Sequence, residues 1–239
     1  MRYSTFFLLL SSLVPLTHGC LQREQFGERR GNEIISPQEP SALQKVASKQ
    51  KTDAPLLKLY GGPRTRTPIV QWYLEELEIP YKYISLDIRA KENRQPEFLA
   101  INPMGKVPAI VDDELKLWES GAILLYLADK HRQMPSESGE RAKIIQWVFF
   151  ANATLSPGLF LKERREKEMP RLLAPLNKIL QKQSFITGDK LTVADIAIAS
   201  YLYYAQLLLS LDFSKYPAVV TYLDRITTRP AFKKTLGKR

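Results

Sequence analysis

The sequence predicts an α/β domain followed by an all-helical domain, and three observations support this fold class. Residues 56–86 have the pattern of a strand, a helix and a second strand. Residues 107–117 have the pattern of a β-hairpin that leads directly into a helix. After a loop at 134–139, the apolar residues are spaced three and four apart, as in packed helices. We therefore place the two domains at 56–133 and 140–239.

The first domain begins with the strand–helix–strand unit. Leu56 to Tyr60 are expected to form a short strand that ends in a Gly-Gly-Pro turn. A helix is expected from Thr67, because Pro68 fits the first helical turn, where a backbone N–H has no partner in the helix. Tyr81 to Leu86 alternate as the second strand. The residues of the helix that should face inward are Ile69, Val70, Tyr73, Leu74 and Leu77.

The rest of this domain is the hairpin and a second helix. Residues 107–111 and 115–117 are the predicted strands, joined through Asp112-Asp113-Glu114, and the helix opens at Glu119 and Ser120. The order is β-α-β and then β-β-α. This order is typical of a thioredoxin-like domain.

The second domain is expected to be a set of packed helices. Pro157-Gly158 should kink or break the first of them, since proline removes a helical hydrogen bond. Thr192 and Asp195 match a capping box, in which a hydroxyl and a carboxylate satisfy exposed N–H groups at a helix start. The predicted helices are near 141–161, 166–183, 193–210 and 216–226.

A ligand site is predicted in the first domain, between the hairpin and the helix that follows it. Pro108 has no N–H, so the backbone of Val107 beside it is free to pair with a group outside the sheet. A cis bond here would turn Val107 toward a groove. The helix that starts near Ser120 brings unpaired N–H groups and the positive end of its dipole to the same groove. These features predict a seat for an extended, anionic, peptide-like ligand.

This arrangement resembles the glutathione-site signature of the soluble glutathione transferases, and the resemblance extends over both predicted domains. It implies that the backbone of Val107, before a cis Pro108, pairs with the cysteinyl part of glutathione. It also implies that Glu119 and Ser120 hold the γ-glutamyl end. Lys106 lies where relatives place a polar side chain toward the glycyl carboxylate, which an ammonium suits. The resemblance further implies a homodimer. A thioredoxin-like fold that keeps the cis proline for architecture alone is the alternative.

Catalysis in this family requires the thiolate of glutathione. A thiol with a pKa of about 8.5 is only a few per cent ionised at neutral pH, so a transferase must stabilise the anion. The loop at 62–67 offers a hydroxyl, cations and a helix N-terminus for this purpose. The tyrosine or serine that relatives carry there is absent. Thr65 is the hydroxyl candidate, and Arg64 and Arg66 are the cationic candidates. The loop and the helix after it resemble the bacterial Chi-type class most. Solvated charges and a helix cap are the alternative interpretation.

The acceptor pocket for an electrophile is expected between this loop and the kinked helix. The activity that the resemblance implies is conjugation of glutathione, as co-substrate, to small electrophiles. Two alternatives stay open: a glutathione- or ligand-binding protein with little turnover, and a structural or interaction domain. The pocket residues predicted are Phe149, Asn152, Ser156 and Phe160, although aromatic residues at this spacing also fit a core.

Composition limits other chemistries. The only cysteine is Cys20, outside both predicted domains, which excludes an internal disulfide, a CxxC motif and a cysteine nucleophile within them. Cysteine-dependent glutathione transferases and thiol–disulfide exchange are therefore disfavoured. His18 and His131 are too few and too far apart for a metal site, so no metal is expected. The net charge of +10 attracts anions in general, but no known nucleic-acid module is present, and no nucleic-acid partner is expected.

The first 55 residues precede the predicted domains. Residues 1–19 have the basic start, apolar stretch and small-residue end of a signal segment. They also resemble a bacterial lipoprotein signal, in which Cys20 would be lipidated and anchor the protein to a membrane. The alternatives are a plain secretory signal, an organelle presequence and a start site placed too far upstream. The protein could therefore be exported, tethered to a membrane or cytoplasmic. Residues 20–55 are polar and proline-interrupted, which predicts a disordered tether.

Overall fold

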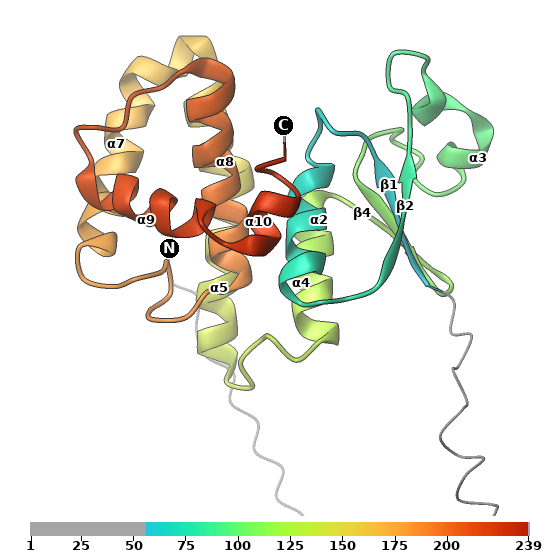
Figure 1. Ribbon diagram of the computed structural model, residues 1–239, viewed down its shortest axis with the longest axis horizontal. Coiled ribbons are helices and arrows are strands. Elements are labelled where there is room, and N and C mark those ends of the chain that lie inside the picture. Colours follow the sequence, from blue (N-terminus) through green and yellow to red (C-terminus); the bar gives the residue numbers. More distant parts are fainter. Residues whose placement is uncertain (1–55, 239) are drawn as a thin grey trace, which may run out of the picture. The chain divides into compact units, whose positions relative to one another are not determined.

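The computed structural model describes residues 56–238, all within one compact unit that extends from Thr52 to Arg239. It confirms the predicted fold class: a mixed four-stranded sheet with its helices is followed by an all-helical part (Figure 1). The predicted signal segment at 1–19, the tether at 20–55 and Cys20 lie outside the described residues.

The sheet has the strand order β2-β1-β3-β4. β1 (Leu57–Gly61) and β2 (Tyr81–Ser85) are parallel, as expected for strands that are joined through a helix. β3 (Ala109–Asp112) runs antiparallel to β1 and forms the predicted hairpin with β4 (Leu115–Trp118). The sheet ladder on β3 begins directly after Pro108, because proline has no N–H to contribute.

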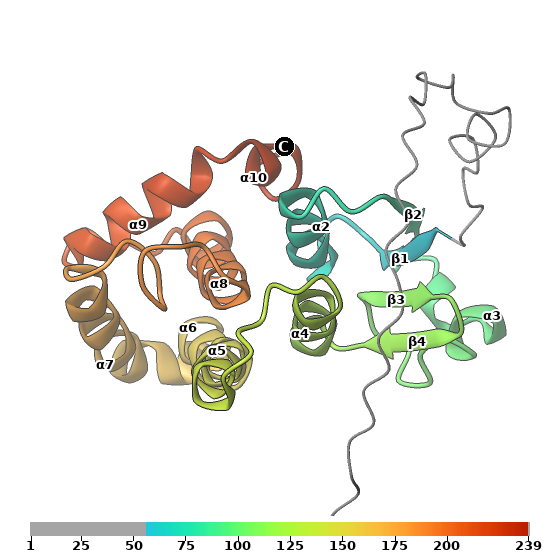
Figure 2. The ribbon, with the colours of Figure 1, turned by 90° about the horizontal axis from the view of Figure 1, so that it is seen from below.

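α2 (Thr67–Glu76) and α4 (Ser120–Lys130) lie side by side between the sheet and the helical part (Figure 2). A helix that is covered on two sides needs apolar residues around most of its circumference. This explains why α2 buries Trp72 in addition to the residues predicted to face inward. Of those residues, Leu77 lies just beyond the end of the helix and is only partly buried. Trp72 meets the ring of Phe232 edge-on, with the ring centroids 5.2 Å apart.

The sequence does not predict three short helical elements. A 3-10 turn, η1 (Glu92–Arg94), and α3 (Pro96–Leu99) lie in the connection between β2 and β3, and α3 is on the side of the sheet away from α2 and α4 (Figure 2). α10 (Pro230–Lys234) packs against α2 near the end of the chain. Each element is too short to leave a helical period in the sequence.

The second part contains α7 (Lys162–Leu180), α8 (Val193–Leu209) and α9 (Pro217–Thr227), which match the predicted helices to within a few residues. It begins with α5 (Ser138–Phe150), which accounts for the first half of the helix predicted near 141–161. α8 is the most buried of them, and it packs against α5 and α9 as well as α2 and α4. Within the described part of the chain, none of the helices is both long and apolar enough to cross a membrane.

The first helix of this part continues through Pro157 instead of breaking there. α5 is followed by a π-helical turn, η2 (Ala151–Leu155), and then by α6 (Ser156–Phe160). Pro157 cannot donate a hydrogen bond to the preceding turn, and the wider π turn directly before it accommodates the missing bond. The predicted irregularity is therefore a π turn within a continuous helical run.

The start of α8 is held by a buried carboxylate, and the predicted capping box is confirmed. Asp195 accepts hydrogen bonds from the Thr192 N–H at 2.8 Å and from the Ile186 N–H at 2.7 Å. It also accepts from the hydroxyl of Tyr222, on α9, at 3.1 Å. Burial raises the pKa of Asp195, and the hydrogen bonds from Ile186 and Thr192 oppose this effect. The cap thus joins the preceding loop, α8 and α9.

Replacing Asp195 with alanine should lower the free energy of unfolding by roughly 3 kcal/mol or more, because the buried groups of Ile186 and Tyr222 lose their acceptor. Thr192→Ala, which removes only the cap hydroxyl, should cost about 1 kcal/mol. Denaturant unfolding of both variants measures the difference. An Asp195→Ala variant as stable as Thr192→Ala would contradict the role of the carboxylate.

Candidate functional site

The loop before β3 carries the predicted cis bond between Val107 and Pro108. Val107 is half-buried and Pro108 is buried. Behind the loop, the buried side chain of Asn102 donates to the carbonyl of Lys106 at 2.7 Å and accepts from the Met104 N–H at 3.0 Å. Asn102 therefore fixes the backbone that leads into Val107.

η1 supports the same loop from the other side. Asn93 donates to the carbonyl of Gly105 at 2.7 Å, and Arg94 donates to the carbonyl of Met104 at 3.2 Å. Gly105 has a φ of +57°, and a Cβ there would lie 2.8 Å from the carbonyl oxygen of Asn93. Glycine is required at this position, and η1 is part of the support of the site.

The start of α4 presents the predicted acidic–serine pair. Ser120 is the first residue of the helix and is 3% exposed. Glu119 before it has φ 71° and ψ 117°, a conformation that is rare for a residue other than glycine. The side chain of Glu119 is exposed, and so is that of Lys106, whose ammonium has no partner within residues 56–238. Both are accessible to a ligand that arrives from solvent.

The loop before α2 is closed by Thr65. Its hydroxyl donates to the carbonyl of Gly62 at 2.7 Å, accepts from the Thr67 N–H at 3.0 Å and lies 2.7 Å from the Thr67 hydroxyl. These contacts fill the hydrogen-bonding capacity of the hydroxyl. Thr67 packs so closely on Gly61 that a Cβ at Gly61 would collide with the Thr67 side chain. Thr65 would have to exchange one of its partners to bond a sulfur.

The two arginines of this loop lie in different surroundings. Arg64 is exposed and forms no ion pair within the described residues. The guanidinium of Arg66 lies over the ring of Tyr201, 5.4 Å from its centroid, in a cation–π contact. The hydroxyl of Tyr204 donates to the carbonyl of Thr65 at 3.2 Å. Two tyrosines of α8 therefore hold the loop.

Tyr201 also reaches the other half of the site. Its hydroxyl donates to Oδ1 of Asn152 at 2.7 Å and lies beside the hydroxyl of Ser120. Asn152 in turn donates to the carbonyl of Val148 at 2.9 Å. Burial raises the pKa of Tyr201, and the nearby Arg66 opposes this effect, so the hydroxyl is neutral at physiological pH. One neutral side chain thus connects the start of α4, η2 and the loop before α2.

A groove of about 980 Å³ opens beside the loop before α2, and we call it the acceptor groove. The loop, α8 and the residues around the end of α10 form its walls. Ser156 and Phe160 line it, as predicted. Phe149 and Asn152 do not line it: Phe149 is 63% exposed, and the amide oxygen of Asn152 accepts a hydrogen bond from Tyr201.

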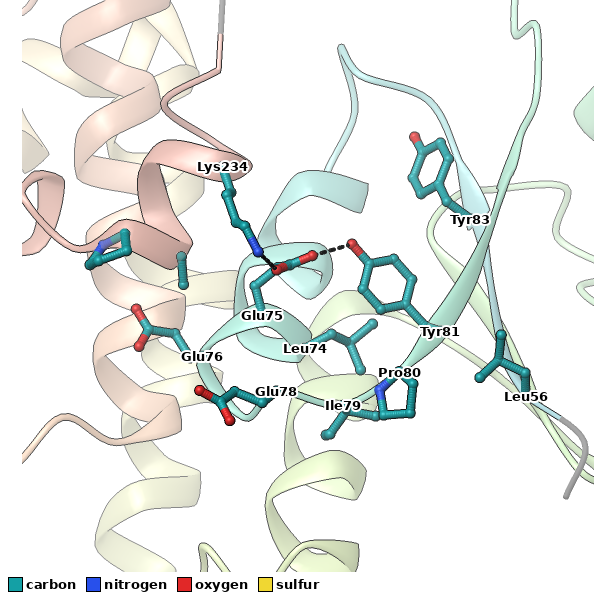
Figure 3. Close-up of a pocket in the computed structure, with 12 residues that line it drawn as sticks. Leu56, Leu74, Glu75, Glu76, Glu78, Ile79, Pro80, Tyr81, Tyr83 and Lys234 are labelled. Atoms are coloured by element: carbon teal, nitrogen blue, oxygen red, sulfur yellow. Dashed lines mark hydrogen bonds and ion pairs between the residues drawn. The ribbon is translucent and has the colours of Figure 1, made fainter. Parts of the chain in front are cut away.

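A second groove, of about 850 Å³, lies between the end of α2, β2 and α10 (Figure 3). Lys234 lines both grooves, and its ammonium donates to Glu75 at 2.9 Å. Tyr81 donates to the other oxygen of Glu75, also at 2.9 Å. The hydrogen bond from Lys234 lowers the pKa of Glu75, although burial opposes it, and burial raises the pKa of Tyr81 to about 12. These three groups satisfy one another, and we assign them no chemistry.

The candidate site is built from hydroxyls, cations and backbone amides. Among residues 56–238, no group of three or more histidine, cysteine, aspartate or glutamate side chains is arranged to hold a metal ion.

Comparison with known proteins identifies the family. Residues 55–129 match the family description "Glutathione S-transferase, N-terminal domain", and residues 141–239 match "Glutathione S-transferase, C-terminal domain". The chain belongs to the glutathione S-transferase family. The two matches follow the order of the sheet-containing and helical parts, and the cis bond and the Glu119–Ser120 pair lie within the first of them.

Relatives of this family member share about a third of its residues. "Disulfide-bond oxidoreductase YfcG" of Escherichia coli strain K12 is 35% identical over 206 residues, which cover 77% of this chain and 95% of the relative. "Glutathione S-transferase GstB" of the same strain is 35% identical over 204 residues, 76% of this chain and 98% of the relative. A crystal structure of a Burkholderia graminis glutathione transferase, with two glutathione molecules bound per subunit, has a TM-score of 0.66 at 29% identity and covers 86% of this chain and 97% of that chain.

The sequence analysis missed the residues that hold the site together. Asn93 and Asn102 are polar residues in a stretch without a periodic signal, and Tyr201 and Tyr204 have the spacing of ordinary core residues on a helix. Only the contacts between α8, α4 and the loop before α2 give the two tyrosines a role at the site. No signal in a single sequence identifies such contacts.

Tyr201→Phe should weaken glutathione binding by about 1 kcal/mol, roughly fivefold, because Asn152 loses its hydrogen-bond donor and Ser120 loses the hydroxyl beside it. The ring beneath Arg66 is retained in this variant. Titration calorimetry measures the affinity. Tyr203→Phe is the matched control, because Tyr203 is on the same helix and its hydroxyl bonds to no group in the described part of the chain. Equal affinities for all three proteins would contradict the role of Tyr201.

Proposed function

We propose that this protein is a glutathione transferase that conjugates the thiolate of glutathione to small electrophiles. The observation that carries the proposal is the junction at Tyr201. This side chain joins the start of α4, where an anionic ligand can bind, to the loop that offers a cation for the thiolate. Family membership supports the same activity. Nucleophile and electrophile would then meet where the loop borders the acceptor groove.

Glutathione would bind along the loop before β3. The free backbone of Val107 pairs with the cysteinyl part, as sheet strands pair. The hydroxyl of Ser120 and the N–H groups at the start of α4 donate hydrogen bonds to the γ-glutamyl carboxylate, and the exposed carboxylate of Glu119 meets the γ-glutamyl amino group. Lys106, exposed and without a partner among the described residues, meets the glycyl carboxylate.

The thiol would be activated by charge and by backbone amides. Lowering its pKa by about two units requires about 2.7 kcal/mol of preferential stabilisation of the thiolate. The hydroxyl of Thr65 is occupied within the loop, whereas the N–H groups of Thr65 and Arg66 donate to no acceptor in the described part of the chain. The guanidinium of Arg66 is fixed on Tyr201 beside them. We therefore assign most of the stabilisation to Arg66 and to these amides.

The proposed reaction is a nucleophilic attack by sulfur on carbon. The thiolate sulfur attacks an electrophilic carbon in the acceptor groove and forms the carbon–sulfur bond. A leaving group, where the substrate has one, departs with the electron pair of the broken bond. The resemblance to the Chi-type class makes isothiocyanates a first substrate to assay; their addition breaks no bond to a leaving group and ends with proton uptake at nitrogen.

Glutathione-dependent disulfide reduction is a second candidate, favoured by the relative named as a disulfide-bond oxidoreductase. The absence of cysteine from residues 56–238 does not exclude it, because two glutathione thiols supply the electrons and become glutathione disulfide as the substrate disulfide becomes two thiols. Assaying a model disulfide and a model electrophile with one enzyme preparation separates the two activities.

Two further proposals follow from the sequence and the family. We propose a homodimer, as the resemblance implies. We also propose that Cys20, which lies outside the described residues, anchors the protein to a membrane if residues 1–19 act as a lipoprotein signal.

Ser120→Ala should reduce glutathione affinity by about 1.5–3 kcal/mol, because it removes a hydrogen bond to a carboxylate. The serine is buried, so circular dichroism and thermal unfolding must first establish that the variant is folded. Calorimetric titration then gives the affinity. An unchanged affinity in a folded Ser120→Ala variant would reject the proposed seat.

Arg66→Gln should raise the pKa of the bound thiol by about one unit, equivalent to roughly 1.4 kcal/mol. Thr65→Ala should raise it less, since the Thr65 hydroxyl has its partners within the loop. The pH dependence of thiolate absorbance in the complex with glutathione gives the pKa. Thr65→Ser, which keeps the hydroxyl, controls for disturbance of the loop. If Arg66→Gln and Arg64→Gln keep the wild-type value while Thr65→Ala abolishes ionisation, the hydroxyl activates the thiol and the assignment to arginine is wrong.

A further inference from the structure

The acceptor groove has an unusual combination of walls. Phe160, Tyr201, Tyr204 and Leu208 give it an apolar side, and Leu208 is 60% exposed although it is a large aliphatic residue. Such a surface is suited to the apolar body of a small molecule. An apolar side alone would select neutral, hydrophobic electrophiles.

The charged residues of the acceptor groove are all cations. They are Arg64, Arg66, Lys234 and Lys238, and no aspartate or glutamate among residues 56–238 lines the groove. This excess of positive charge is local and does not simply follow from the net charge of the chain, because three glutamates and one lysine line the second groove. A cleft with charges of one sign concentrates ligands of the opposite sign.

Two of these cations form no ion pair in the described part of the chain. Lys234 pairs with Glu75 at 2.9 Å (Figure 3), and Arg66 is stacked on Tyr201. Arg64 and Lys238 are exposed and form no ion pair within residues 56–238. They are available to a ligand in the groove.

The carboxylates of glutathione do not require these two cations. In the proposed seat they meet Lys106 and the start of α4 at Ser120, and neither residue lines the acceptor groove. Glutathione therefore leaves Arg64 and Lys238 for a second, different ligand. An anionic group on that ligand would match them.

We propose that the acceptor groove selects electrophiles that carry an anionic group, such as a carboxylate, beside an apolar or aromatic reacting part. The inference rests on the proposed function and names its substrate class. The apolar wall holds the reacting part near the thiolate, and Arg64 and Lys238 bind the anionic group at the open side. The preference is electrostatic and partly exposed to solvent, so it weakens as salt is added.

A matched pair of substrates tests the preference. The full chain with saturating glutathione is assayed with 4-chloro-3-nitrobenzoate and with its methyl ester; in both reactions the sulfur displaces chloride. Each kcat/KM is divided by the rate constant of the uncatalysed reaction with glutathione, which removes the difference in intrinsic reactivity. We expect the normalised value to be higher for the carboxylate, and the preference to fall severalfold between low and high salt.

Variants assign the preference to the groove. Lys238→Gln should lower the carboxylate-to-ester ratio about threefold, and the double variant Arg64→Gln/Lys238→Gln should lower it further. Lys238→Arg should retain the ratio because it keeps the charge. Lys233→Gln is the matched control: Lys233 is on α10 beside Lys234 but does not line the groove. A wild-type preference for the ester, or a ratio that the double variant leaves unchanged, would overturn the proposal.

Equilibrium binding separates this proposal from the proposed function. 3-Nitrobenzoate and its methyl ester lack the leaving group, and their affinities for the glutathione-loaded protein are measured by calorimetry in the same variants. If the wild-type protein binds the carboxylate more tightly than the ester and the double variant does not, the anion preference is supported. This result would hold even if neither chloro compound is turned over. In that case only the proposed function fails. Equal binding of the two ligands to the wild-type protein overturns the anion preference.

Discussion

The site depends on the contact between Tyr201 of α8 and the two helix starts of the thioredoxin-like part. The Tyr201 hydroxyl lies beside Ser120 and donates a hydrogen bond to Asn152 at 2.7 Å. The guanidinium of Arg66 lies over the ring of Tyr201, 5.4 Å from the ring centroid. Burial raises the pKa of this hydroxyl, so it is neutral and donates its hydrogen bond to Asn152. The position of the ligand seat relative to the loop before α2 is therefore set by a side chain from the helical part.

A contact of this kind requires that the two parts cannot move against each other. Glu76, at the end of α2, accepts hydrogen bonds from Nε and Nη2 of Arg229, both at 2.7 Å. It also accepts a hydrogen bond from the indole N–H of Trp72 at 2.8 Å. The carboxylate is largely buried, and a bidentate pair with an arginine is the geometry that best offsets the cost of burying it. With Phe232 packed edge-on against Trp72, α10 holds α2 in place. The family resemblance assigns the chemistry to the first part, but the helical part fixes the distances.

The sequence predicts the regular parts of the molecule well and the supports of the site poorly. The strands, α2, α4 and α8 follow from apolar period and cap residues, and the cis bond before Pro108 follows from the family signature. η1 and α10 are too short to produce a period. Tyr201 has the spacing of a core residue, so its role appears only once α8 lies against α4. Of the four residues predicted for the pocket, Ser156 and Phe160 line the acceptor groove, whereas Phe149 is exposed and Asn152 contacts Tyr201.

The loop before α2 shows how a site can depart from its family pattern without losing the means to act. Thr65 uses its hydroxyl to close the loop on Gly62 and Thr67, so in the proposed mechanism cations and amides stabilise the sulfur of bound glutathione. The same loop places Arg64 and Arg66 at the acceptor groove, and no carboxylate side chain among residues 56–238 lines it. In the two proposals Arg66 stabilises the thiolate and Arg64 binds the anionic electrophile, so neighbouring positive charges serve the two ligands. The two effects are coupled: each negative ligand reduces the field available to the other, so an anionic electrophile should bind best beside the neutral thiol and react best beside the thiolate.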